Sequence, residues 1–112
     1  MLFLTYWELN ESLSSKERLN VAKNLAESGL FPPKGVKIIR WDTSPDGWGI
    51  LLLEAETASD VGRTLNAWRT AVPGFFKFTK TSPAMPLQDA IAAGQELQQS
   101  IDALNLAKVS AN

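Results

Sequence analysis

The fold is decided by the stretch Asp42-Thr43-Ser44-Pro45-Asp46-Gly47-Trp48-Gly49-Ile50-Leu51-Leu52-Leu53-Glu54. Its Ser-Pro-Asp-Gly segment predicts a tight turn, because proline and glycine preset the backbone angles that a turn needs. The residues from Trp48 to Glu56 form the most apolar strand of the sequence, and those from Val36 to Thr43 predict a strand before the turn. The stretch therefore predicts an antiparallel hairpin, and the other elements can be placed around it.

Upstream of the hairpin the sequence predicts a strand and a helix. The segment from Leu2 to Glu8 is apolar on both faces of the predicted strand, which is typical of a strand at the centre of a sheet. Ser14 and Glu17 form a capping box that begins a helix, and Gly29 is placed to end it. The apolar stripe of this helix is predicted at Leu19, Ala22, Leu25 and Ala26. Its charged residues Lys16, Arg18 and Lys23 are interpreted as a solvated face.

Downstream of the hairpin a second helix and a fourth strand are predicted. Thr57 and Asp60 resemble a capping box at the start of a helix. The apolar residues that follow have the spacing of one helical face: Val61, Leu65, Trp68 and Val72. Phe75 to Thr81 predicts a strand with Phe76 and Phe78 on one face, opposite to Lys77 and Thr79. The order strand, helix, strand, strand, helix, strand predicts an α+β, ferredoxin-like fold. Right-handed crossovers then place both helices on one face of a four-stranded antiparallel sheet whose first and third strands are central.

The end of the chain predicts a separate unit. Ser82 to Pro86 has the composition of a linker, so residues 1–82 are predicted to form the core and residues 83–112 a linker with an extra C-terminal amphipathic helix. A narrow apolar seam follows this helix at Leu87, Ile91, Gly94, Leu97, Ile101 and Leu104. The seam suits packing on the chain's own sheet, on a dimer mate or on another protein, and the pattern leaves these alternatives open.

Alternation divides the hairpin between the two faces of the sheet. One set suits the helix side: Val36, Ile38, Leu51, Leu53 and Ala55. The other set is Lys37, Ile39, Trp41, Trp48, Ile50, Leu52 and Glu54, where Lys37 lies opposite Glu54 if Thr43 pairs with Trp48. This second face is too apolar to leave in water. We therefore expect a homodimeric α/β barrel with an interface at Ile39, Trp41, Ile50 and Leu52. A monomer whose C-terminal helix covers the sheet is the alternative.

Composition limits the chemistry that the chain can perform. The 112 residues include 11 basic and 12 acidic side chains, and this balance favours neither nucleic acid nor an anionic membrane as a partner. The sequence has no cysteine and no histidine, which excludes thiol nucleophiles, thiolate metal sites and the commonest general acid and base. We expect no cofactor and no metal. No apolar run approaches the about 20 residues of a membrane span, so a cytoplasmic location is expected.

Five residues are candidates for a ligand site. The chain has four tryptophans, which could wall a pocket for a planar or apolar molecule, with Trp68 interpreted as core. Glu54 could act as a base if it were buried, with Lys37 or Arg40 orienting an anionic substrate, although a cross-strand salt bridge explains the same residues. The candidate ligand-binding residues are Trp7, Lys37, Trp41, Glu54 and Lys77.

Several motifs resemble those of a known family. They are Pro32-Pro33-Lys34-Gly35-Val36, the run from Gly35 to Trp41, Asp46-Gly47, and Trp68 followed by the strand around Phe76. In order and spacing these resemble a family of short bacterial proteins known as domain of unknown function 3303, over roughly residues 1–85. Similar members often carry a histidine where this chain has Asp42, and the tail after Pro86 is longer than the family pattern. The resemblance implies a ferredoxin-like, dimeric α/β-barrel fold and no established activity.

These observations predict a small dimeric protein that binds a small ligand or a protein partner on the aromatic sheet face, without catalysis. Two alternatives remain. One is a cofactor-free monooxygenase or isomerase of the dimeric α/β-barrel class, suggested by analogy of fold. The other is an interaction module that docks through its C-terminal helix.

Overall fold

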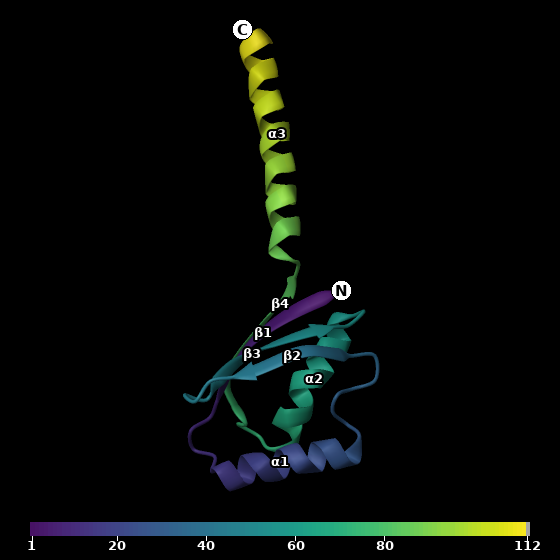
Figure 1. Cartoon of the computed structure of the whole chain (residues 1–112), viewed down its shortest axis with the longest axis vertical. Coiled ribbons are helices and arrows are strands. Elements are labelled where there is room, and N and C mark those ends of the chain that lie inside the picture. Colours follow the sequence, from purple (N-terminus) through teal and green to yellow (C-terminus); the bar gives the residue numbers. More distant parts are fainter. Residues whose placement is uncertain (112) are drawn as a thin grey trace.

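The computed structural model describes the backbone of residues 1–111 and the side chains of residues 1–106. Its elements follow the order β1 (Leu2–Leu9), α1 (Ser15–Ser28), β2 (Lys37–Thr43), β3 (Trp48–Glu54), α2 (Ala58–Ala71), β4 (Phe76–Ala84) and α3 (Leu87–Ala111). The sheet has the order β2-β3-β1-β4 with every neighbouring pair antiparallel. This confirms the α+β, ferredoxin-like fold with β1 and β3 at the centre. Figure 1 shows α1 and α2 on one side of the sheet, while α3 projects away from it.

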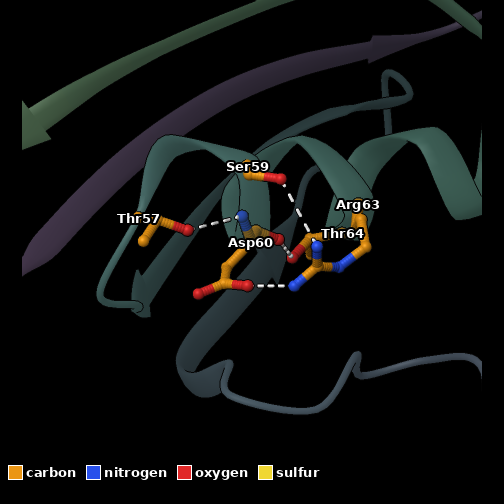
Figure 2. Close-up of polar contacts among 5 residues, drawn as sticks. All are labelled: Thr57, Ser59, Asp60, Arg63 and Thr64. Atoms are coloured by element: carbon orange, nitrogen blue, oxygen red, sulfur yellow. Dashed lines mark hydrogen bonds and ion pairs between the residues drawn. The ribbon is translucent and has the colours of Figure 1, made fainter.

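The predicted turn and helix ends form as expected. Gly47 adopts a left-handed φ of 78° in the turn between β2 and β3, where its amide donates to the Ser44 carbonyl at 3.2 Å. The Ser14 hydroxyl accepts from the amide of Glu17 at 3.1 Å and begins α1. The Thr57 hydroxyl accepts from the amide of Asp60 at 3.2 Å and begins α2 (Figure 2). Each cap satisfies an amide that has no partner within its helix.

The core lies between the helices and the covered face of the sheet, here called the helix face. β1 contributes Phe3, Thr5 and Trp7 to it, and β3 contributes Leu51 and Leu53, all of them buried. The Thr5 hydroxyl is fully buried and lies 2.8 Å from the hydroxyl of Thr81 on β4, so this polar group is satisfied. The helices cover this face with Val21, Leu25, Val61, Leu65 and Trp68.

A β-bulge in β2 changes one important assignment. Ile38 lies opposite Leu53, but Arg40 lies opposite Leu52 and Trp41 lies opposite Leu51, so Ile39 is the additional residue. Directly opposed residues share a face, and one extra residue reverses the alternation. Trp41 therefore lies on the helix face, and its predicted place beside Ile39 and Leu52 was wrong. The bulge also explains why Lys37 pairs with Glu54 as predicted although Thr43 pairs with Gly49 instead of Trp48.

The sheet face that no helix covers is here called the open face. Register places on it Leu4 and Tyr6 of β1, Trp48, Ile50 and Leu52 of β3, and Phe78 and Lys80 of β4. Phe78 is half exposed and opposite Glu8, whereas Phe76 is buried in the core, so these two residues do not share the face predicted for them. The prediction failed because the pairing of β1 with β4 shifts between Glu8 and Leu9.

The predicted linker is shorter than expected. β4 runs to Ala84, with Ser82 opposite Leu4 and Pro83 opposite Phe3, so three of the five residues from Ser82 to Pro86 belong to the sheet. Proline is tolerated there because β4 is an edge strand. α3 then begins at Leu87, and its described side chains, residues 87–106, are all exposed. Among the helices within residues 1–111, none combines the length and apolar character that crossing a membrane requires.

Candidate ligand cavity

An aromatic cavity of about 510 Å³ opens beside the helix face. Residues of β1, β2, α1 and α2 and residues at the start of β4 form its wall. The lining residues are Trp7, Leu9, Arg18, Leu19, Ala22, Trp41, Thr43, Trp68, Phe75 and Phe76. This volume lies within the range of about 300–1,000 Å³ that small-molecule sites occupy in proteins. We refer to it as the aromatic cavity.

The aromatic side chains of the cavity form one connected network. The ring of Trp41 lies 5.6 Å from that of Trp68 and 6.2 Å from that of Trp7, in both cases edge to face. Phe31 closes the group with ring centroids 5.3 Å from Trp41 and 5.2 Å from Trp68, and Trp68 lies 5.0 Å from Phe75. These are favourable aromatic distances, and neighbouring rings hold each indole in place.

Three of the side chains that line this cavity carry a buried hydrogen-bond donor without a partner. These donors are the indole Nε1 of Trp7, the indole Nε1 of Trp68 and the Nε of Arg18. Both indoles belong to side chains that are more than nine-tenths buried, with 3% and 8% of their surface exposed. The guanidinium of Arg18 is held by a hydrogen bond of 2.8 Å that it donates to the carbonyl of Asn10. A buried donor without an acceptor costs about 1–3 kcal/mol, so three at one cavity require an explanation.

Gly49 makes the position of Trp7 possible. A Cβ atom at Gly49 would lie 2.5 Å from Cζ2 and 2.9 Å from Cε2 of Trp7, and it would also collide with the carbonyl of Asp42. The indole of Trp7 therefore lies directly over the backbone of β3, where any larger residue would displace it. Glycine in a strand often marks such a close approach.

A second hollow of about 480 Å³ lies between the end of α1 and α2. Residues along it include Leu30, Pro33, Arg63 and Asn66. The Arg63 guanidinium is already engaged, because it donates to the carboxylate of Asp60 and to the hydroxyl of Ser59 (Figure 2). None of the unpartnered buried donors of the described residues belongs to this hollow, so we favour the aromatic cavity as the candidate site.

The five residues predicted for a ligand site do not come together. Trp7 and Trp41 meet in the aromatic cavity, but Lys37 and Glu54 oppose each other across β2 and β3 on the other side of the sheet. Lys77 is exposed on β4 and does not line the aromatic cavity. The split follows from the bulge at Ile39, which moves Trp41 to the helix face and leaves the charged pair on the open face.

Sequence reasoning missed Arg18 and assigned Trp68 to the core alone. Arg18 was placed on a solvated face, but it is partly buried and lines the aromatic cavity. Leu19, predicted as core, is 69% exposed at the rim. The buried stripe of α1 in fact centres on Val21 and Leu25, and Arg18 precedes these two residues by three and seven positions. That helical spacing was the available signal. Trp68 was correctly interpreted as core, and it is also part of the cavity wall.

On the open face, polar groups pair among themselves. The hydroxyl of Tyr6 donates to the Glu8 carboxylate at 2.7 Å, and this hydrogen bond is the main reason that the pKa of Tyr6 is raised. Arg40 and Asp42 form an ion pair at 2.6 Å. The ring of Tyr6 lies 5.9 Å from that of Trp48 and 6.2 Å from that of Phe78. Within the described part of the chain, no group of carboxylates is arranged to hold a metal ion.

Three solved structures are similar to the chain, each over 77% of its length. A protein from Streptomyces coelicolor A3(2) matches along 100% of its own chain, with 14% identity and a TM-score of 0.46. A protein from Nitrosomonas europaea described as a "putative antibiotic biosynthesis monooxygenase" matches along 97%, with 16% identity and a TM-score of 0.48. A protein from Agrobacterium tumefaciens matches along 93%, with 10% identity and a TM-score of 0.45. At these values the likeness assigns no activity.

No curated protein matches the chain. The model of the family described as Domain of unknown function (DUF3303) matches residues 1–98. The match includes the whole sheet, both packed helices and the first part of α3, and so reaches further than the roughly 85 residues over which the motifs resemble the family. The chain therefore belongs to the DUF3303 family.

Proposed function

We propose that this protein binds a small planar molecule in the aromatic cavity, and that the molecule carries hydrogen-bond acceptors and a negative charge. The observation that carries the proposal is the coincidence of the cavity with the unpartnered donors of Trp7, Trp68 and Arg18. An acceptor-bearing ligand would supply, after small movements of these side chains, the partners that the donors lack.

The walls and the charge define the class of ligand. Tryptophan and phenylalanine rings favour a flat aromatic or quinone-like body through offset and edge-to-face contacts. Arg18 is the only charged side chain along the described lining, and a guanidinium pairs well with a carboxylate, a phenolate or a carbonyl oxygen. We therefore propose an anionic or carbonyl-bearing aromatic compound in preference to a cation.

Binding without catalysis is the activity that this lining supports best. Proton abstraction needs a base whose pKa lies near the working pH, within hydrogen-bond reach of the substrate. Of the described residues along the cavity, Arg18 alone carries an ionisable side chain at neutral pH, and a guanidinium stays protonated. Glu54, the candidate base, lies on the opposite side of the sheet.

The test is a titration of tryptophan emission with planar carboxylates, phenolates and quinones, and with a planar amine as the cationic comparison. Arg18→Gln is expected to weaken binding of the best anion by about tenfold or more, because a charge-assisted hydrogen bond contributes about 1.5–3 kcal/mol. Lys23→Gln is the matched control, since it removes the same charge from a side chain on α1 that is 72% exposed. Equal affinities for the two variants would contradict the proposal. Oxygen consumption in the presence of a bound compound would instead assign an oxygenase.

We also propose that a second copy of the chain covers the open face. Leu4, Ile50 and Phe78 are exposed there. Arg40 forms an ion pair with Asp42, and Glu8 accepts a hydrogen bond from Tyr6, so these three charged groups already have partners within the face. An identical face would therefore meet apolar surface without bringing an unpaired charge at these positions. Ile50→Lys is expected to lower the sedimentation mass, whereas Leu30→Lys, at a 64% exposed leucine away from the sheet, is not. Equal masses for the two variants would contradict this interface.

A further inference from the structure

α3 exposes a regular apolar stripe that none of the described residues covers. Figure 1 shows the helix projecting from the end of β4, and every described side chain from Leu87 to Leu106 is exposed. A heptad register fits the stripe, with Ala90 in place of the Ile91 of the predicted seam. Its first and fourth positions are Leu87, Ala90, Gly94, Leu97, Ile101 and Leu104. We call these six residues the α3 seam. A repeat of seven with apolar first and fourth positions is the pattern of helices that pair along their length.

From Leu87 to Ala107 the charged residues of α3 lie away from the seam, and Lys108 at the next first heptad position ends the apolar pattern. The fifth and seventh heptad positions, which flank a helix pair, are Ile91, Gln98, Asn105, Ala93, Ser100 and Ala107, and none of them is charged. The acidic residues of the same stretch, Asp89, Glu96 and Asp102, occupy outer heptad positions. Flanking charges normally select the partner of a coiled coil and repel an identical chain when they are alike. The absence of charge at the flanks makes the seam compatible with a second copy of itself.

Gly94 supplies an independent argument for close approach. It lies inside a helix, where glycine is less favourable than alanine by about 1 kcal/mol. A Cβ atom at Gly94 would meet nothing within 4 Å, so the packing of this chain does not require glycine at that position. Together with Ala90 one turn earlier, it lowers the surface of the seam and lets another helix backbone come near.

We infer that α3 pairs with α3 of a second copy of this chain along the α3 seam. This interface is distinct from the open face and from the aromatic cavity, so it adds a second self-association surface to the protomer. If both the open face and the α3 seam are used, two arrangements are possible. The same two chains contact each other through both surfaces, or each surface contacts a different chain and an oligomer larger than a dimer forms.

The test compares leucines that differ only in their heptad position. Leu97 lies on the seam and is 62% exposed, and Leu106 lies on the outer side of the helix and is 70% exposed. Leu97→Lys and Leu106→Lys therefore make the same change at similarly exposed sites of one helix. In sedimentation equilibrium of the full chain, Leu97→Lys is expected to raise the dissociation constant by about tenfold or more relative to Leu106→Lys, because it places a charge within the apolar seam.

The Ile50→Lys variant separates this inference from the proposed open-face dimer. If the surfaces are distinct, Leu97→Lys and Ile50→Lys each leave residual association, and only the double variant is a monomer at every concentration. Equal dissociation constants for Leu97→Lys and Leu106→Lys would overturn the inference, and a different protein would then be the candidate partner of the seam. Complete dissociation by Ile50→Lys alone would also overturn the inference, because the seam would then contribute no association of its own. Complete dissociation by Leu97→Lys alone would instead contradict the open-face dimer. All four tryptophans precede Ala71, so unchanged near-ultraviolet circular dichroism verifies that each variant keeps its core.

Discussion

Trp41 lies directly opposite Leu51 across β2 and β3, so its indole lies on the helix face, where it contacts Trp7 of β1 and Trp68 of α2. Trp48, seven residues later, faces away from the helices and is 41% exposed. This relationship shapes the aromatic cavity, because it gathers three of the four tryptophans in one wall.

The first prediction compares these two tryptophans. Trp41→Ala should lower the free energy of unfolding by about 3 kcal/mol, because it opens a hole in a packed aromatic network. Trp48→Ala should cost less than about 1 kcal/mol, because an exposed side chain loses little burial. Urea unfolding followed by far-ultraviolet circular dichroism, at a concentration low enough to suppress association, measures both. If Trp48→Ala lowered the free energy of unfolding more than Trp41→Ala, the assignment of Trp41 to the helix face would be contradicted.

The second prediction concerns Gly49 and its contact with Trp7. Gly49→Ala should destabilise the fold by about 1–3 kcal/mol, because the added methyl group must push the indole and the β2 backbone away. Gly62→Ala is the control, since the nearest atom to its Cβ would be the side-chain nitrogen of Asn66 at 4.0 Å. That change should be neutral or stabilise α2 by up to about 1 kcal/mol. If Gly49→Ala were as stable as wild type, the described position of Trp7 would be incorrect.

The third prediction concerns the cap of α2. Thr57→Ala should lower the free energy of unfolding by about 0.5–2 kcal/mol, because the amide of Asp60 loses its acceptor. Thr70→Ala, at an exposed position in the last turn of the same helix, should change it by less than about 0.5 kcal/mol. Thermal or urea unfolding distinguishes the two variants. Equal stability would show that the cap contributes nothing.

The fourth prediction uses the single tyrosine of the chain. The hydrogen bond to Glu8 raises the pKa of Tyr6, so tyrosinate absorbance should appear at a higher pH in the folded chain than in urea. Because the folded pKa is raised, the interaction stabilises the fold below the ordinary tyrosine pKa and is lost as Tyr6 ionises. Glu8→Gln should move the titration back toward its ordinary range, and an unchanged titration would refute the assigned cause.

Much of the fold follows from local signals in the sequence. Ser14, Thr57 and Gly29 mark helix ends through the chemistry of their own side chains and backbone, and the Pro-Asp-Gly turn forms without help from distant residues. The apolar character of β1 on both faces correctly predicted a central strand. These features depend on a few neighbouring residues, which is why sequence reasoning reaches them.

The candidate site depends on features that have no local signal. Nothing in the sequence around Ile39 distinguishes a bulged strand from a regular one, yet the bulge decides the face of Trp41. Arg18 was interpreted as solvated because it is charged, whereas it is partly buried, lines the cavity and donates a hydrogen bond to the Asn10 carbonyl. Long-range packing determines both outcomes. The extent of β4 was missed for the same reason, since Pro83 is acceptable in a strand only when that strand lies at the edge.

The most direct test of the central claim follows the four indole N–H signals in a nitrogen-15 correlation spectrum during titration with 1-naphthoate, a planar aromatic anion. If the ligand binds in the aromatic cavity, the signals of Trp7 and Trp68 move, the signal of Trp48 stays in place, and Arg18→Gln reduces the movement at each ligand concentration. Movement confined to Trp48 would contradict binding in this cavity, because it would place the ligand on the open face of the sheet.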